Sequence, residues 1–156
     1  MIFNPDWIPA LISLANCYES IKQYSMADSL YQEVLNIDPE NATVLNNYGY
    51  SLSIRGIQLD RALSMAEKAV KQNPDNGSFL DTIGWILYKK GRFEEALEYL
   101  EKAFNKRDDS AEVADHLGDV YKRLGMDEKA KMSWEKALEL EPNNEFIKNK
   151  LNQLME

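Results

Sequence analysis

The sequence predicts an all-α fold in which helical hairpins stack one after another, and two observations lead to this prediction. First, Pro5, Pro39, Pro74 and Pro142 follow one another at separations of 34, 35 and 68 residues. Self-similarity at a fixed period of this length is typical of stacked-repeat proteins. Second, the residues between the prolines show apolar spacing of about 3.6 residues and no run with the alternation of a strand. We therefore expect pairs of helices and no sheet.

Small residues recur where the two helices of each hairpin should meet. We number the repeat from Ile8 as position 1 and use these positions throughout. Position 8 is Ala15, Gly49, Gly84 and Gly118, and position 20 is Ala27, Ala62, Ala96 and Ala130. Small side chains at both positions allow close approach of the helices, and a larger one would overpack the hairpin at a cost of roughly 1–3 kcal/mol.

The turns and helix starts follow the same period. Gly56, Gly91 and Gly125 stand where a left-handed residue would end the first helix of a hairpin, but the first repeat has Lys22 there. The second repeat carries one extra residue within residues 57–61, which a longer turn should absorb because connections tolerate insertion. The residues expected to cap the following first helices are Asn41, Asn76 and Ser110.

This pattern resembles the tetratricopeptide repeat (TPR), a helix-turn-helix unit with a small residue in each helix. The resemblance covers residues 8–144 and implies a right-handed superhelix, or α-solenoid. It predicts the following organisation: residues 1–7 as the tail of a preceding repeat, 8–41 as repeat 1, 42–76 as repeat 2, 77–110 as repeat 3, 111–144 as repeat 4, and 145–156 as a capping helix.

Repeats 2–4 also resemble the C-terminal part of long bacterial TPR proteins, some of which are envelope adaptors or scaffolds. The segments that carry this likeness begin at Leu45, Leu80 and His116. The resemblance favours a bacterial origin and leaves both a cytoplasmic and an envelope location open. The chain itself shows no signal peptide, because its N-terminus lacks a basic region followed by an apolar core.

Composition narrows the classes of partner. The net charge of −8 argues against binding to nucleic acid or anionic lipid. No stretch approaches eighteen consecutive apolar residues, so the sequence predicts no membrane insertion. Cys17 has no second cysteine for an internal disulfide and is expected to be a small buried apolar residue.

The ionisable residues do not converge on a reactive pattern. His116 is the one histidine, between Asp115 and Asp119, which are four residues apart on one expected helix face. Two carboxylates without a third ligand make a weak metal site, and a solvated acidic face is the simpler interpretation. No nucleophile–base pair or phosphate-binding glycine loop occurs. The sequence predicts no catalytic residue, no metal and no cofactor.

The TPR resemblance instead implies a concave groove, lined by the first helix of each repeat, that binds a peptide or helix of another protein. The residues expected to form it are Asn16, Asn46, Tyr50, Asp81, Trp85, Tyr88, Asp115 and Asp119. Aromatic residues there would supply apolar contact, and the carboxylates would favour a basic ligand. In the alternative, the aromatics pack against the next helix and only edge into the groove.

Two further functional hypotheses follow from the resemblance. A carboxylate clamp of the co-chaperone kind would need cations, but its basic positions hold Ile12, Ser78 and Thr82, so we reject chaperone-tail binding. A structural protein whose repeats contact other copies of itself is the alternative to a partner-binding module.

The two ends carry separate expectations. Residues 145–154 should form a helix whose Ile147, Leu151 and Leu154 cover repeat 4. At the other end, Ile8, Leu11 and Ile12 should be more exposed than their counterparts, because no preceding helix is expected to cover them. Such an open end of a fragment would allow self-association.

Overall fold

The computed structural model describes residues 7–155, without the side chain of Met155, and every regular element in that range is an α-helix. The predicted all-α class is therefore confirmed. Contacts divide the chain after Asn73 into two units, which we call unit 1 and unit 2. Within the described range no helix combines the length and the apolar character needed to cross a membrane.

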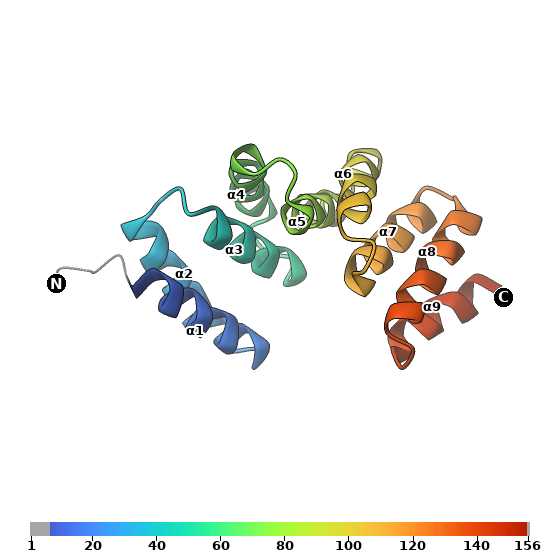
Figure 1. The fold of residues 1–156 in the computed structure, drawn as a ribbon, viewed down its shortest axis with the longest axis horizontal. Coiled ribbons are helices and arrows are strands. Elements are labelled where there is room, and N and C mark those ends of the chain that lie inside the picture. The colour runs from blue at the N-terminus through green and yellow to red at the C-terminus, as the bar shows by residue number, and fades with distance from the viewer. Residues whose placement is uncertain (1–6, 156) are drawn as a thin grey trace. The chain divides into compact units, whose positions relative to one another are not determined.

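Each unit consists of consecutive helical hairpins (Figure 1). In unit 1 the hairpins are α1–α2 and α3–α4, with α1 at Ile8–Ser20, α2 at Tyr24–Ile37, α3 at Ala42–Ile54 and α4 at Leu59–Gln72. In unit 2 they are α5–α6 and α7–α8, followed by α9, with α5 at Gly77–Lys89, α6 at Phe93–Lys106, α7 at Ala111–Arg123, α8 at Asp127–Leu140 and α9 at Glu145–Met155. The proline period thus separates one hairpin from the next.

The small residues lie where the helices of a hairpin touch. The position-20 alanines are fully buried. A Cβ on Gly84 would lie 2.7 Å from Leu100 Cγ, and a Cβ on Gly118 would overlap the indole ring of Trp134. Larger side chains at position 8 would therefore push the two helices apart.

The turns and caps follow the sequence pattern. The three turn glycines have φ values of 68°, 77° and 73°, and Lys22 takes the same left-handed conformation with φ 59°. The extra residue of repeat 2 lies in a longer turn, 55–58, where Gln58 is also left-handed with φ 49°. The side chains of Asn41, Asn76 and Ser110 accept backbone hydrogen bonds at the starts of α3, α5 and α7.

Helix α9 packs on α8 through Ile147, which is buried, whereas Phe146 is exposed. Asn144 accepts a hydrogen bond from the Ile147 backbone N–H at 3.3 Å. This is the capping contact that also opens α3 and α7, so α9 begins in the register of a first helix of a hairpin.

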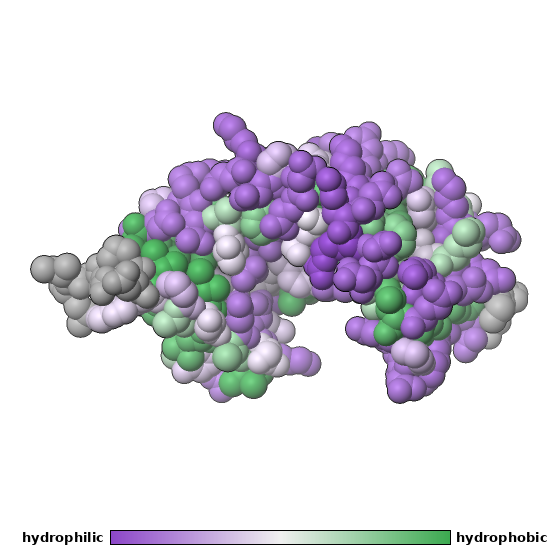
Figure 2. Space-filling view, in the orientation of Figure 1, coloured by the Kyte–Doolittle hydropathy of each residue, from purple (hydrophilic) through white to green (hydrophobic). Residues whose placement is uncertain are grey.

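Helix α1 differs from the other first helices in how much apolar surface it exposes. Leu11 is partly exposed, whereas Leu45, Leu80 and Ala114 at the same position are buried. Trp7 and Ile21 are 51% and 61% exposed, and Figure 2 shows green patches over the region of α1 and α2. Cys17 is exposed, so the expectation that it is buried was wrong. The tail predicted for residues 1–7 lies, apart from Trp7, outside the described residues.

The close contact at position 8 predicts the result of a single substitution. Gly118→Ala places a methyl group against the rigid, buried Trp134 ring, so we expect the free energy of unfolding to fall by about 1–3 kcal/mol. Glu98→Ala, at an exposed site on α6, is the control and should change it by less than about 0.5 kcal/mol. Urea unfolding followed by circular dichroism measures both. Equal stability of Gly118→Ala and the control would contradict this account of the hairpin.

Candidate partner-binding face

The first helices of the hairpins form one side of each unit, which we call the first-helix face. In unit 1 it is formed by α1 and α3, and in unit 2 by α5, α7 and α9. Along this face, the side chain at position 6 of a later first helix of the same unit contacts position 9 of the preceding first helix, and in unit 2 also position 5. We call this contact the position-6 interlock.

His116 forms the interlock between α7 and α5. Its Nδ1 lies 2.9 Å from Asp81 Oδ1, and both side chains are buried. Burial acts to lower the pKa of His116, but the charge of Asp81 and its hydrogen bond raise it, as do Glu112 and Asp115. The net direction is upward from the ordinary value of 6.5. Folding therefore shifts the balance of His116 toward the imidazolium form.

An aromatic stack continues the same contact. The Trp85 ring lies 4.0 Å from the His116 ring and 4.8 Å from the Tyr88 ring, with interplanar angles of 14° and 10°. Tyr88 in turn meets Phe93 edge-on at 5.5 Å. Trp85 and Tyr88 nevertheless remain partly exposed. The ring contacts thus fix the orientation of two aromatic side chains that keep part of their surface exposed.

Lys150 forms the interlock between α9 and α7. Its Nζ donates to Asp115 Oδ1 and to Asp119 Oδ1, each at 2.7 Å. All three side chains are no more than 18% exposed. Lys150 Nζ also lies 4.7 Å from the centre of the Phe146 ring and 5.8 Å from that of Trp134. One ammonium group therefore bonds to both carboxylates on this face and compensates one of their two negative charges.

Burial shifts the pKa values of two side chains in this cluster. Burial raises the pKa of Asp119 above its ordinary value, and the hydrogen bond and charge of Lys150 offset only part of that rise. Burial also raises the pKa of Tyr88, and the nearby Asp119 adds to the effect. Tyr88 therefore remains protonated at neutral pH and can donate a hydrogen bond.

A small hollow of about 170 Å³ lies beside this cluster. It is lined by Tyr88, Asp119, Lys122, Arg123, Trp134, Lys150, Gln153 and Leu154. Lys122 pairs with Asp127 at 3.1 Å, and the Arg123 guanidinium lies over the Phe93 ring at 4.8 Å. The hollow continues the surface that begins at the aromatic stack.

In unit 1 the interlock is built from neutral groups. Asn47, at position 6, donates to Asn16 Oδ1 at 3.3 Å. The Tyr31 hydroxyl also lies 2.7 Å from this oxygen. Asn46 is buried and Tyr50 is partly exposed. The interlock in unit 1 is thus made by amides, whereas in unit 2 it is made by charged and aromatic groups.

The predicted groove residues differ in how exposed they are. Trp85, Tyr88, Tyr50 and Asn16 retain exposed surface, whereas Asp81 and Asn46 are buried. The sequence predicted Asp81, at position 5, to lie in the open groove. It did not predict that the position-6 side chain of the next first helix, His116, would cover Asp81. The missed residues are His116 and Lys150, and the opposite charges at separations of 35 and 31 residues were the signal that could have identified them.

Within residues 7–155 no three His, Cys, Asp or Glu side chains converge on a point where a metal ion could sit. His116, predicted to lie on a solvated acidic face, is instead buried against Asp81. Its ring is packed against that of Trp85.

Comparisons with known proteins support the repeat assignment. A family profile described as the cilia and flagella-associated protein 70 middle TPR-like domain matches residues 11–144. The TPR repeat-containing protein PA4667 of Pseudomonas aeruginosa is 40% identical over 63 residues, which is 40% of this chain and 11% of that protein. The STIP1 homolog of Dictyostelium discoideum is 36% identical over 86 residues, 52% of this chain and 14% of that protein. The chain thus spans a small part of either relative.

Solved structures share the fold at low identity. PilF of Pseudomonas aeruginosa superposes with a TM-score of 0.82 at 24% identity, covering 96% of this chain and 68% of that one. TTC0263, a TPR protein of Thermus thermophilus, also gives 0.82, at 23% identity, with 94% and 80% coverage. YrrB, described as a TPR protein with an unusual peptide-binding site, gives 0.67 at 23% identity, with 92% and 74% coverage. The predicted resemblance to TPR proteins is confirmed.

The Lys150 interlock makes a prediction about stability. Lys150→Met keeps the length of the side chain but leaves Asp115 and Asp119 facing each other without a cation. We expect a loss of about 1–3 kcal/mol in the unfolding of unit 2, together with faster amide hydrogen exchange in α9. Lys148→Met is the matched control, because Lys148 pairs with the exposed Glu145 on the same helix. A loss no larger than that of the control would show that the contact contributes little.

The His116–Asp81 pair predicts a pH dependence with a defined sign. Because folding raises the pKa of His116, its contribution is fully present below the unfolded value near 6.5 and is lost as pH rises through the folded pKa. The free energy of unfolding of unit 2 should therefore fall as the pH rises above the ordinary value of 6.5. Urea titrations followed by tryptophan fluorescence test this, and His116→Gln should flatten the slope. Stability that rises over this range would contradict the assignment.

Proposed function

The chain belongs to the TPR-like family of the cilia and flagella-associated protein 70 middle domain, and from this premise we propose that it is a non-catalytic protein-interaction module. In this proposal the first-helix face of unit 2 binds an extended segment or a helix of another protein. The adaptor or scaffold role of such a module would follow from the partner it holds.

The exposed aromatic stack is the observation that carries this proposal. Trp85 and Tyr88 are large aromatic side chains that remain partly exposed although a parallel ring supports them. Aromatic side chains are enriched among the residues that dominate binding energy, because they contribute a large contact area at a low entropic cost. The support from His116 and Phe93 fixes their orientation before a ligand arrives.

Charge argues for an apolar contact at the centre of this site. Asp81 pairs with His116, and Asp115 and Asp119 pair with Lys150. A basic ligand would have to compete with these internal partners for each carboxylate, which weakens the expected preference for a basic partner. We therefore propose a ligand that places an apolar or aromatic side chain against Trp85 and Tyr88.

Self-assembly is the second candidate, and a separate observation favours it. Helix α1 exposes Leu14 and Ile21 in addition to Trp7, at the N-terminal part of unit 1. Contact between copies through these side chains would bury apolar surface. Light scattering at increasing concentration separates the candidates, since self-assembly needs no second protein. A mass that stays that of one chain over the accessible range would rule this candidate out.

The interaction proposal can be tested with a library of random 16-residue peptides displayed on phage, selected against the full chain. Peptides that bind the first-helix face should lose at least about 2 kcal/mol, or roughly 30-fold in affinity, on Trp85→Ala. Tyr88→Leu, which keeps bulk but removes the ring, should weaken the same peptides. Isothermal titration gives the affinities, and circular dichroism checks that each variant is folded.

Tyr99→Ala is the matched control, because Tyr99 is a partly exposed aromatic on the second helix of the same hairpin. It should leave these affinities within about threefold of the parent value, since it lies outside the proposed site. The proposal fails if no selected peptide depends on Trp85, or if Tyr99→Ala weakens binding as much as Trp85→Ala.

A further inference from the structure

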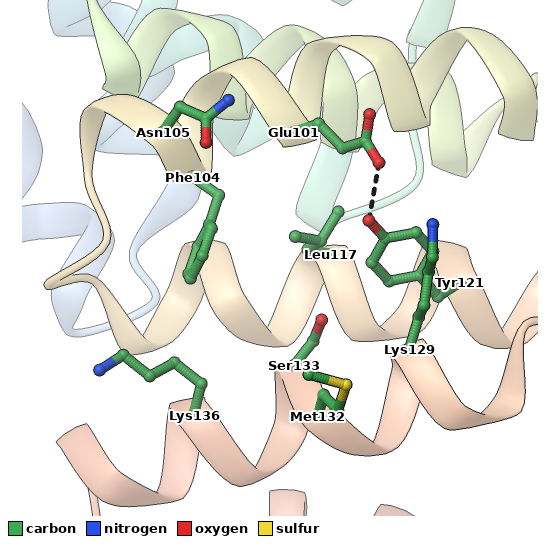
Figure 3. Close-up of a pocket in the computed structure, with 9 residues that line it drawn as sticks. All are labelled: Glu101, Phe104, Asn105, Leu117, Tyr121, Lys129, Met132, Ser133 and Lys136. Atoms are coloured by element: carbon green, nitrogen blue, oxygen red, sulfur yellow. Dashed lines mark hydrogen bonds between the residues drawn. The ribbon is translucent and has the colours of Figure 1, made fainter.

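We propose that unit 2 carries a second docking site, on its opposite side, for a segment that presents one apolar side chain flanked by carboxylates. The site is a hollow of about 580 Å³ between α6 and α8, with α7 behind it (Figure 3). Its lining residues are Glu101, Phe104, Asn105, Leu117, Tyr121, Lys129, Met132, Ser133 and Lys136. Leu117 and Tyr121 lie on α7, but no lining residue belongs to the interlock, the aromatic stack or the smaller hollow described above, so this proposal does not depend on the proposed function.

A departure from the repeat explains why the hollow exists. Position 23 is Leu30, Met65 and Tyr99 in the first three repeats but Ser133 in the fourth. A large side chain that would fill the gap between consecutive second helices is therefore replaced by a hydroxymethyl group. The loss of side-chain volume at this one position leaves space that the neighbouring helices do not close.

Position 22, next to it, also differs from the other repeats, here from a polar to an apolar side chain. Position 22 is Ser29, Ser64 and Glu98 in the other repeats, all exposed and polar, but in repeat 4 it is Met132, which is 68% exposed. Compared with the other repeats, repeat 4 thus has the small polar Ser133 at the floor of the hollow and the flexible apolar Met132 at its rim. Methionine at an exposed rim is well suited to contact an apolar ligand, because its unbranched side chain adapts to different shapes.

The floor and walls of the hollow are largely apolar. Leu117 and Tyr121 are buried, and Phe104 contributes a partly exposed ring. The Tyr121 hydroxyl donates to Glu101 Oε1 at 2.7 Å. Burial and this carboxylate both raise the pKa of Tyr121, so the hydroxyl remains a donor. Glu101 is therefore engaged with Tyr121, and Figure 3 shows this bond at one side of the cavity.

The charge around the hollow identifies the kind of ligand. Lys129 and Lys136 stand at two ends of the α8 wall (Figure 3). Lys129 Nζ lies 5.2 Å from the centre of the Tyr121 ring, and Lys136 Nζ lies 3.4 Å from an exposed carboxylate, Glu139 Oε2. Two cations beside an apolar floor, in a chain whose net charge is −8, are complementary to an apolar side chain with Asp or Glu on either side.

The size of the hollow agrees with such an occupant. Its volume falls within the range of roughly 300–1,000 Å³ that is typical of ligand pockets in proteins. A leucine, methionine or phenylalanine side chain, with the backbone that carries it, can enter from the Met132 side. The lysines would then lie within reach of carboxylates one helical turn before and after that side chain.

The test uses the same displayed 16-residue peptide library, selected against the full chain, with Ser133→Leu for counter-selection. Ser133→Leu restores the kind of side chain found at this position in the other repeats, so it should fill the hollow without loss of stability. Peptides that bind wild type but not Ser133→Leu should contain an apolar residue with Asp or Glu three or four residues away. Lys129→Glu and Lys136→Glu should each weaken these peptides at least about threefold.

Two controls make the result specific. Ser64→Leu adds an exposed leucine at position 22 of α4, outside the hollow, and should leave peptide binding unchanged. A peptide at this site should also shift the NMR signal of the Met132 methyl group and retain its affinity in Trp85→Ala, which separates it from first-helix ligands.

Three outcomes would overturn the proposal. One is a library that yields no peptide sensitive to Ser133→Leu. Another is a set of sensitive peptides rich in lysine and arginine instead of carboxylates. The third is binding of a small apolar dye, 8-anilinonaphthalene-1-sulfonate, that Ser133→Leu abolishes while no peptide binds, since the hollow would then be a small-molecule site.

Discussion

The position-6 interlock is the interaction on which the arrangement of the first helices in unit 2 depends. His116 reaches back from α7 to Asp81 of α5, and Lys150 reaches back from α9 to Asp115 and Asp119 of α7. Since a charge withdrawn from water destabilises the fold unless it is paired, each contact requires that the next first helix be in place. The apolar hairpin core holds two helices together, and the interlock aligns one hairpin with the next.

The interlock also decides what the face can recognise. Carboxylates at positions 5 and 9 would form an acidic groove if they stood alone, but here they are already paired within unit 2. The surface left for a partner is the exposed part of Trp85 and Tyr88. Their rings stack on each other, and His116 stacks on Trp85. The proposed recognition is therefore apolar at its centre. On the opposite side of unit 2, Ser133 and Met132 line an apolar hollow that is bordered by Lys129 and Lys136.

The repeat and its turns could be predicted from the sequence because they depend on local rules. Steric limits at Gly84 and Gly118, left-handed turns at the glycines and side-chain caps all act within a single hairpin or turn. The site was harder to predict from the sequence, because its contacts join residues more than thirty positions apart. Asp81 was expected in the open groove, yet its burial follows from His116 in the next repeat. The hollow at Ser133 likewise depends on what is absent at one position, which a search for conserved spacing does not reveal.

The central claim is that the first-helix face of unit 2 binds through aromatic contact, since its own lysine and histidine satisfy the carboxylates. The salt dependence of affinity for a Trp85-sensitive peptide tests this most directly. Ion pairs between exposed groups weaken as the Debye length shortens from about 10 Å at 0.1 M salt to about 3 Å at 1 M, whereas apolar contacts do not. The account predicts that the dissociation constant changes less than about threefold over this range. A fall in affinity of about tenfold or more would contradict it and would mean that the carboxylates remain available to a basic ligand.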